Sequence, residues 1–260
     1  MKDTLSSIAR RTLPGFVHRW VGTQLKGEKY TPPVGKIDFG SLGGLTPISR
    51  HFGFDRGLPI DRYYIEKFLT KNTADVKGHV LEIGDNSYTR QFGGDRVNES
   101  DVLHIVEGNP QATILGDLTN AEHIASDKFD CFILTQTLQC IYDTRAAIKT
   151  IYRILKPGGV VLATFSGISL TPPDEWGDYW CWNFTSQSGK RLFAEFFPEA
   201  NIQVESYGNV LAAIAFLQGL ATEELDSSEL DHRDRSYELL ITVRAVKPQE
   251  TDISRKDVET

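Results

Sequence analysis

The chain lacks the features that mark several large classes of protein. Its 260 residues contain only three cysteines, whose odd number excludes a complete disulfide framework and whose spacing gives no metal-ligand pattern. No apolar run approaches the roughly 18 to 20 residues that cross a bilayer, and the N-terminus lacks the apolar core and cleavage site of a signal peptide. We therefore expect a reducing, cytoplasmic setting and no metal requirement.

The chain also lacks an excess of basic residues. It carries 28 Lys and Arg against 35 Asp and Glu, a net charge of −7. Because nucleic-acid backbones demand a basic surface, this balance argues against a general nucleic-acid binder. The hydrophobic content of 40% and the charged content of 24% are ordinary for a globular protein with a sizeable core. The oligomeric state stays open.

Composition divides the chain into three regions. Residues 1–58 form an N-terminal amphipathic arm followed by a Gly- and Pro-rich linker or lid, residues 59–248 form the main domain, and residues 249–260 form a polar tail expected to be disordered. The arm mixes apolar and basic side chains, and Pro14 divides it into two short helical pieces. Two interpretations stay open for it: a lid packed on the body, or a peripheral contact with an anionic membrane surface.

Apolar runs and helical patterns alternate through the main domain. The expected strands are 79–83, 102–106, 112–115, 131–134, 160–165, 202–207 and 239–246, and the expected helices are 59–69, 145–155, 187–197 and 211–220. Strands that alternate with helices build parallel sheets, so the pattern predicts an α/β fold.

The segment from Phe129 to Phe165 is the most specific. It contains a buried strand, the polar turn Thr135-Gln136-Thr137, a helix that ends at Lys156-Pro157-Gly158-Gly159, and a second buried strand. This pattern resembles the late half of a class I S-adenosylmethionine-dependent methyltransferase, and the resemblance covers about residues 61–246. It implies a Rossmann-like sheet of seven strands, mostly parallel with an antiparallel last strand, with helices on both faces. It also implies S-adenosyl-L-methionine as the cofactor.

The loop after the first strand departs from the pattern of that family. An acidic residue and G-x-G-x-G are typical there, because a tight turn brings the backbone close to the cofactor. This chain has Glu82 and Gly84, but Asn86 and Tyr88 stand at the second and third glycine positions. Asn tolerates left-handed backbone, so we expect Asn86 to replace a glycine, whereas Tyr88 cannot. The following helix should be short, because Gly93-Gly94-Asp95 interrupts it.

The next strand ends carry the other cofactor candidates. A carboxylate after the second strand accepts ribose hydroxyls in nucleotide-binding sheets. The resemblance implies that an acidic residue after the third strand accepts from adenine, that the next N–H meets a ring nitrogen, and that the fourth loop passes under the cofactor. An arginine before the first helix would pair with the cofactor carboxylate. The expected cofactor-binding residues are Arg56, Glu82, Gly84, Asn86, Glu107, Gly108, Asp117, Leu118, Thr135, Gln136 and Thr137.

An aromatic segment, residues 174–185, follows the fifth strand and holds three of the four tryptophans. Such rings stack on sugars or flat ligands, and a nearby carboxylate can hold a hydroxyl or remove its proton. We expect Trp176, Tyr179, Trp180 and Asp55 to bind the acceptor, with Asp178 as the leading catalytic candidate and His51 as the second. The pattern resembles methyltransferases associated with bacterial glycan or natural-product biosynthesis. Alternatively, the tryptophans fill the core beneath a long loop.

The resemblance implies methyl transfer to a hydroxyl of a sugar, glycan or small metabolite. Two other hypotheses stay open. The altered glycine loop is compatible with a protein that binds the cofactor without catalysis. The second hypothesis is an NAD(P)-linked or nucleotide-sugar enzyme, although no G-x-G-x-x-G follows the first strand.

Overall fold

The computed structural model describes residues 31–172 and 175–249, with the backbone alone at Glu175 and Trp176. The chain divides into two compact units, 1–45 and 46–260. The described part of the first unit contains a 3₁₀ turn, η1 (Gly40–Leu42). The second unit begins at Thr46, within the region that the sequence assigned to the arm and linker. The arm proper and the tail from residue 250 lie outside the described residues.

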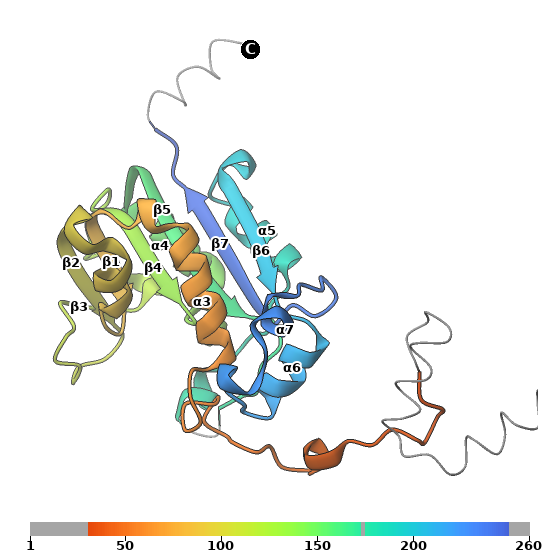
Figure 1. Ribbon diagram of the computed structural model, residues 1–260. Helices are drawn as coiled ribbons and strands as arrows, with labels where there is room; N and C mark the ends of the chain where they lie inside the picture. The colour runs from red at the N-terminus through yellow and green to blue at the C-terminus, as the bar shows by residue number, and fades with distance from the viewer. Residues whose placement is uncertain (1–30, 173–174, 250–260) are drawn as a thin grey trace, which may run out of the picture. The chain divides into compact units, whose positions relative to one another are not determined.

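One seven-stranded sheet forms the centre of the second unit (Figure 1). Its order is β3-β2-β1-β4-β5-β7-β6, with bounds β1 (Gly78–Ile83), β2 (Val97–His104), β3 (Ile114–Leu115), β4 (Phe129–Thr135), β5 (Leu155–Ser166), β6 (Ile202–Tyr207) and β7 (Leu240–Val246). Strands β1 to β5 are mutually parallel, and β7 is antiparallel to both β5 and β6. The predicted Rossmann-like sheet is confirmed.

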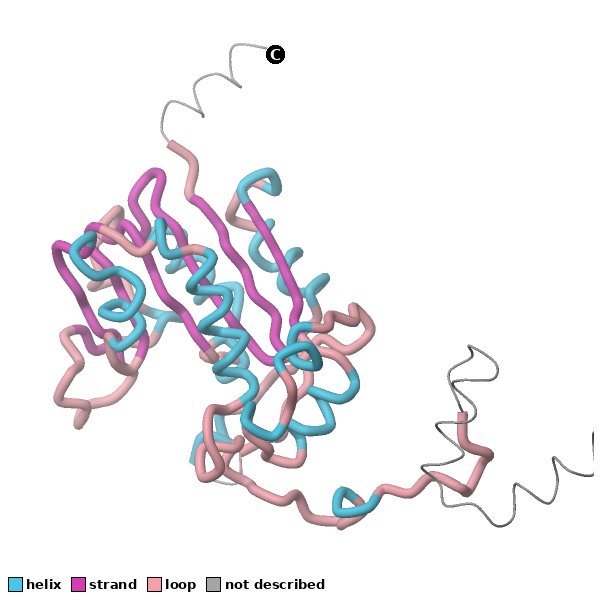
Figure 2. The backbone as a smooth tube through the Cα atoms, viewed as in Figure 1, coloured by secondary structure: helices cyan, strands magenta, loops and turns pink. Residues whose placement is uncertain are grey.

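Helices cover both faces of the sheet (Figure 2). They are α3 (Ile60–Lys71), α4 (Thr144–Ile154), α5 (Ser186–Ala194), α6 (Val210–Leu217) and α7 (Ser227–Asp231). Strand residues alternate between the faces: Phe132 joins the core under α4 and α5, whereas Cys131 and Ile133 join the core under α3 and α6. Side-chain caps fix helix starts, as where Asp143 accepts from the Ala146 N–H at 3.0 Å.

Several strand boundaries differ from the prediction, most of all at β2, which begins at Val97 instead of residue 102, and at the start of β5. Strand β2 ends at His104, because Ile105 and Val106 lie exposed in the following loop. Strand β5 begins at Leu155, so Pro157 and its glycines lie inside its first residues instead of before it. The β4–β5 register shifts there, which accommodates a proline that cannot donate to the ladder.

The helix after β1 is short, as expected. It consists of a π-helical turn, η3 (Thr89–Gly93), followed by the 3₁₀ turn η4 (Gly94–Arg96). Gly93 permits this close return, since a Cβ there would lie 2.3 Å from a methyl of Val97. Among the described residues, no helix has the length and apolarity to cross a membrane.

The chain order reverses between β1 and β4. These strands are parallel neighbours, but the chain leaves β1 toward β2 and leaves β4 toward β5. The crevice outside the carboxyl ends of two such strands is where open α/β sheets bind their ligands.

Candidate functional site

Two residues with positive φ bound this crevice. Gly84, directly after β1, has φ +79°, and Gln136, directly after β4, has φ +48°. A Cβ built on Gly84 would meet no heavy atom within 4 Å, so the space in front of its backbone is open. A positive φ is strained for a residue with a side chain, and such strain persists where the surroundings hold it. One side of the site is therefore the open backbone of Gly84, and the other side is the conformationally constrained backbone of Gln136.

Glu82 holds the loop after β1. It is 3% exposed, and its carboxylate accepts hydrogen bonds from the Tyr88 N–H at 3.1 Å and from the Thr89 N–H and hydroxyl, each at 2.7 Å. Burial raises the pKa of Glu82 to about 7, although these donors act in the opposite direction. We propose that Glu82 positions the loop, in place of the direct cofactor contact expected from the sequence.

The two substituted glycine positions serve different purposes. The expectation of left-handed backbone at Asn86 is wrong, since its φ is not positive. Its side-chain Oδ1 is buried without a protein partner, which suits a ligand that donates a hydrogen bond. Tyr88 is buried against Phe92, and its hydroxyl accepts a bond from Arg62 at 2.7 Å. The side chain at the third glycine position thus braces the loop against α3.

The ends of β2 and β3 present carboxylates on the same edge. Glu107 is exposed and has no hydrogen bond or ion pair to a described residue, and Gly108 has φ +107° with open space before it. Asn109 ties this loop to the first by donating to the Gly84 carbonyl at 2.5 Å. Asp117 is exposed and uses Oδ1 to accept from the Thr119 N–H at 2.8 Å, which leaves Oδ2 available.

Leu118 and the Thr135–Thr137 turn complete the predicted cofactor set. The Leu118 side chain is buried in the core, so its backbone N–H is the group available for a ring nitrogen. Thr137 donates its hydroxyl to the Thr135 carbonyl at 2.9 Å, which tightens the turn after β4.

Arg56 is engaged away from the strand ends. Its guanidinium pairs with Glu224, through Nε at 3.1 Å and through a second, shorter contact. The backbone close to Arg56 is hydrogen-bonded to the segment that carries Glu224, because the Thr222 N–H donates to the Leu58 carbonyl at 2.8 Å. His51 is exposed, and Asp55 accepts from the Ser49 hydroxyl at 2.6 Å, a bond that lowers the pKa of Asp55.

A polar network that sequence reasoning largely missed lies at the ends of β4 and β5. The Gln136 amide donates to Asp61 Oδ2 at 3.2 Å and accepts from the Gln139 side chain at 2.7 Å and the Ser166 hydroxyl at 3.0 Å. The other amide oxygen, Gln139 Oε1, is buried without a protein partner. Only the tertiary fold brings these residues together, so their spacing in the sequence carries no signal beyond the strand ends.

The predicted acceptor segment is attached to this network. The Gln139 carbonyl accepts from the Cys181 N–H at 2.8 Å and the Trp182 N–H at 3.1 Å. The Trp182 ring stacks on Tyr142, with centroids 5.6 Å apart, and donates to the Ile141 carbonyl at 3.0 Å.

The described tryptophan and tyrosine rings of the segment are not core residues, whereas Phe184 is buried in the core. Trp182 is 39% exposed and Trp180 is half-buried, so the core-filling interpretation is wrong for both. Asp178 and Tyr179 lie exposed at the end of η7 (Glu175–Tyr179), and the side chain of Trp176 lies outside the described residues.

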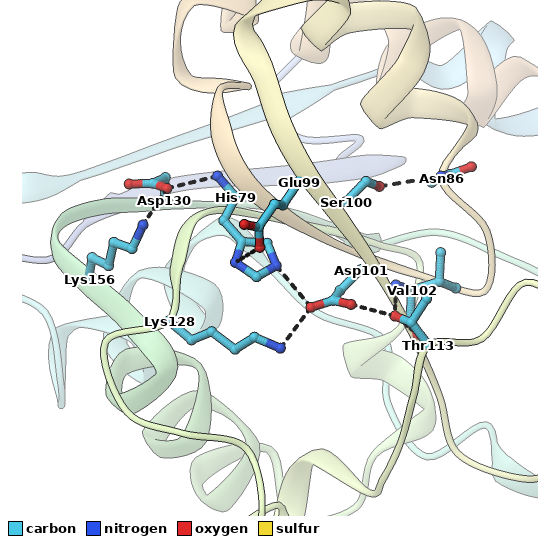
Figure 3. A network of polar contacts seen from close by, with 10 residues as sticks. All are labelled: His79, Asn86, Glu99, Ser100, Asp101, Val102, Thr113, Lys128, Asp130 and Lys156. Carbon is cyan, nitrogen blue, oxygen red and sulfur yellow. Dashed lines mark hydrogen bonds and ion pairs between the residues drawn. The ribbon is translucent and has the colours of Figure 1, made fainter.

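A separate network of charged side chains lies toward the amino ends of the strands (Figure 3). His79 contacts Glu99 at 3.3 Å and Asp101 at 2.9 Å, and Asp101 also pairs with Lys128 at 2.7 Å. Asp130 pairs with Lys156 at 2.7 Å. Side chains from β1, β2 and β4 meet here, so this network links strands. In the part of the chain that the structure describes, no group of three His, Cys, Asp or Glu is arranged to hold a metal ion.

The fold is that of a doubly wound α/β protein, a class whose members bind ligands at the switch point of the sheet. The model of a protein family described as a methyltransferase domain matches residues 77–163, from β1 into β5. Over these residues the predicted resemblance to class I S-adenosylmethionine-dependent methyltransferases is confirmed. The cofactor of this family is S-adenosyl-L-methionine, and the open Gly84 backbone and the strand-end carboxylates fit it.

Part of the chain is also similar to curated proteins. It is 34% identical over 115 residues to the ubiquinone/menaquinone biosynthesis C-methyltransferase UbiE of Haemophilus ducreyi, covering 43% of this chain and 41% of that protein. It is 27% identical over 120 residues to the protein of the same name from Vibrio cholerae, covering 45% and 43%. The chain thus spans less than half the length of the curated relatives it matches.

Solved structures are also similar. One is an S-adenosylmethionine-dependent methyltransferase from Archaeoglobus fulgidus, with a TM-score of 0.49 and 11% identity, over 72% of this chain and 94% of that chain. Another is phosphoethanolamine N-methyltransferase 2 of Haemonchus contortus in complex with S-adenosyl-L-methionine, with a TM-score of 0.44 and 15% identity, over 77% and 60%.

Proposed function

We propose that the chain transfers a methyl group from S-adenosyl-L-methionine to a hydroxyl of a small-molecule, sugar or glycan acceptor. The observation that carries the cofactor assignment is the row of ligand groups on one sheet edge: the open Gly84 backbone after β1, Glu107 after β2 and Asp117 after β3. A row in this order suits an extended ligand with a sugar in the middle and a base at one end.

The residues have distinct proposed roles. Glu107 accepts from the ribose hydroxyls, Asp117 and the Leu118 N–H meet the adenine, and Gly84 lets the backbone approach the other end. The bound cofactor supplies an electrophilic methyl group. What remains for the chain is to align the acceptor and to remove its proton.

The acceptor side rests on the aromatic segment and on residues 51–62. Gln139 joins the two, because its carbonyl holds the aromatic segment while its side chain reaches Gln136 and, through it, Asp61. We propose that Trp180 and Tyr179 contact the acceptor with Asp55 at the opposite side. Asp178 is the leading group to receive the proton and His51 the second.

A carbon acceptor is the second candidate, since the curated relatives are named as C-methyltransferases. The two candidates differ in the product. Because oxygen deshields an attached methyl group, an O-methyl signal lies at lower field in the proton spectrum than a C-methyl signal, so mass and NMR analysis of a labelled product separates the two. Such transfer should survive a chelator, because we expect no metal requirement.

Calorimetry tests the proposal against its alternatives. We expect S-adenosylmethionine and S-adenosylhomocysteine to bind and NAD not to bind. Binding of NAD alone would contradict methyl transfer in favour of a dinucleotide enzyme. Binding of S-adenosylmethionine without transfer to any offered hydroxyl or carbon acceptor would support the cofactor-binding protein without catalysis.

A further inference from the structure

Two cysteines that are far apart in the sequence meet where the aromatic segment joins the loop after β4. Cys140 is the last residue of the 3₁₀ turn η6 (Leu138–Cys140), which follows β4. Cys181 lies in the aromatic segment, two residues after η7. The Cys181 N–H donates to the Gln139 carbonyl at 2.8 Å, so the residue before Cys140 is hydrogen-bonded directly to Cys181.

Covalent geometry turns this hydrogen bond into a limit on the distance between the two cysteines. Across a planar trans peptide, the Gln139 carbonyl oxygen lies about 2.8 Å from the Cα of Cys140, and an N–Cα bond measures about 1.5 Å. The Cα atoms of Cys140 and Cys181 are therefore at most about 7 Å apart, a value that would require every link to be collinear. Because the links are bent, the separation is shorter, which brings the pair within the reach of a disulfide, about 4.4 to 6.8 Å.

The two thiols differ in their exposure. Cys181 is exposed, and its thiol donates a weak hydrogen bond to the Tyr179 carbonyl at 3.2 Å. Cys140 is half-buried, and burial, with a smaller electrostatic effect of Cys181, raises the pKa of Cys140 to about 11. A dissolved oxidant therefore reacts with Cys181 first, and Cys140 reacts second, at the high effective concentration of a neighbouring group. Cys131 is fully buried in β4 and stays out of reach.

The segments that carry the two thiols are already held together without a covalent bond. The Trp182 N–H also donates to the Gln139 carbonyl, at 3.1 Å, and the Trp182 ring donates to the Ile141 carbonyl at 3.0 Å and stacks on Tyr142. A bond between the two sulfurs would reinforce this existing contact. It requires that the Cys181 side chain turn away from the Tyr179 carbonyl, while the backbone contact is already made.

We propose that Cys140 and Cys181 are a reversible disulfide site, with a small disulfide such as glutathione disulfide as the oxidant, and that the bond locks the aromatic segment onto η6. The Cys181 thiolate attacks one sulfur of the oxidant, forms a mixed disulfide and releases one glutathione thiolate. The Cys140 thiolate then attacks the Cys181 sulfur and releases the second. Two protein thiols are oxidised, the oxidant is reduced to two thiols, and the two protons pass from the protein thiols to glutathione.

The lock acts on the proposed acceptor side and leaves the proposed cofactor side unchanged. A cross-link opposes the local opening of the aromatic segment, whereas Gly84, Glu107 and Asp117 lie on the loops after other strands. Oxidation should slow amide hydrogen exchange in residues 177–183 at least about tenfold, because exchange requires that opening. The affinity for S-adenosylhomocysteine should not change. This effect on the acceptor side rests on the proposed function, whereas the disulfide itself does not.

Peptide mapping tests the bond on the full chain. The reduced protein is incubated with glutathione disulfide, its remaining thiols are alkylated, and it is digested without reductant, with cleavage after Phe132 to separate Cys131 from Cys140. The wild type and the control Cys131→Ala should both yield a peptide pair linked through Cys140 and Cys181, which dithiothreitol separates. Cys140→Ser should stop at a glutathione adduct on Cys181, and Cys181→Ser should form no link.

Hydrogen exchange measured by mass spectrometry tests the lock. The oxidised and reduced wild type are compared over residues 177–183, with α6 as the internal reference, and Cys140→Ser is treated with the same oxidant. We expect slower exchange in the oxidised wild type, reversal by dithiothreitol, and no response in Cys140→Ser.

Four results overturn the proposal. A glutathione adduct that persists on Cys181 of the wild type, or a Cys181 disulfide between two copies of the chain, contradicts the disulfide site. A link that forms without slowing exchange in residues 177–183 contradicts the lock. A loss of affinity for S-adenosylhomocysteine on oxidation contradicts its confinement to the acceptor side. If the reduced wild type fails to bind S-adenosylhomocysteine, the proposed function is contradicted, and the mapped disulfide still stands.

Discussion

Thr89 donates two hydrogen bonds, from its backbone N–H and from its hydroxyl, to the same carboxylate oxygen of Glu82, each at 2.7 Å. This pair closes the loop after β1 although two of the three family glycines are absent. A buried carboxylate that accepts hydrogen bonds from the backbone N–H groups of a turn stabilises one conformation of the loop, where the family pattern has glycines that permit a tight turn. The altered loop is therefore fixed by the hydrogen bonds of Glu82, and Gly84 is the position in it with open space in front of the backbone.

The buried Glu82 predicts a pH dependence of stability. Its pKa is about 7 in the folded chain, above the ordinary value of 4.5. The stability that it contributes is full below the unfolded pKa and is lost as the pH rises through the folded pKa. In urea unfolding at several values between about pH 5 and about pH 7.5, Glu82→Gln should flatten this decline. The exposed Glu122→Gln should keep the wild-type slope, and parallel slopes in all three proteins would contradict the prediction.

Glu107→Ala should weaken the cofactor. The change removes charge-assisted bonds to the ribose, on the order of 1.5 to 3 kcal/mol each. Calorimetry with S-adenosylhomocysteine measures the loss, and Glu122→Ala, also exposed, serves as the control. Unchanged affinity in Glu107→Ala would show that this carboxylate does not hold the ribose.

Asp178→Asn should spare the cofactor and slow the reaction. The change keeps size and hydrogen-bonding capacity but removes the charge, so turnover should fall by roughly 10²- to 10⁴-fold, as is typical of a lost acid–base group. Transfer of a labelled methyl group to the acceptor measures it, with Asp95→Asn as an exposed control. Full turnover would assign the role elsewhere, with His51 tested next.

Asp101→Asn should destabilise the sheet without affecting cofactor binding. Burial acts to raise the pKa of Asp101, but bonds from Lys128, Thr113 and His79 together hold it below the ordinary value. The stability from this group is present above the unfolded pKa and is lost as the pH falls through the folded pKa. Urea unfolding at neutral pH should show a loss of about 1 to 3 kcal/mol, which shrinks in acid. An equal loss at both pH values would mean that charge is not involved.

The sheet could be predicted because its central strands are apolar runs of strand length. Residues 131–134 and 160–165 are continuous apolar or near-apolar segments, and both faces of each are buried. The end of β2 was placed two residues too late because Ile105 and Val106 are apolar but exposed. Helix α7 is absent from the predicted helices, since five residues with one buried leucine show no helical period.

The site could be predicted only where it follows strand ends. Gly84, Glu107 and Asp117 are adjacent on the edge because parallel neighbouring strands end together. The contacts of Gln139 with Gln136 and with the aromatic segment depend on the folding of separate loops. The same holds for Arg62, whose partner Tyr88 occupies a position where the family pattern has a glycine.

A crystal structure of the chain with S-adenosylhomocysteine tests the central claim most directly. The account predicts adenine beside Asp117 and Leu118, the ribose hydroxyls on Glu107, and the amino acid over the ends of β1 and β4, near Gly84. Ligand bound at another face of the sheet, or bound with its ribose away from Glu107, would contradict it.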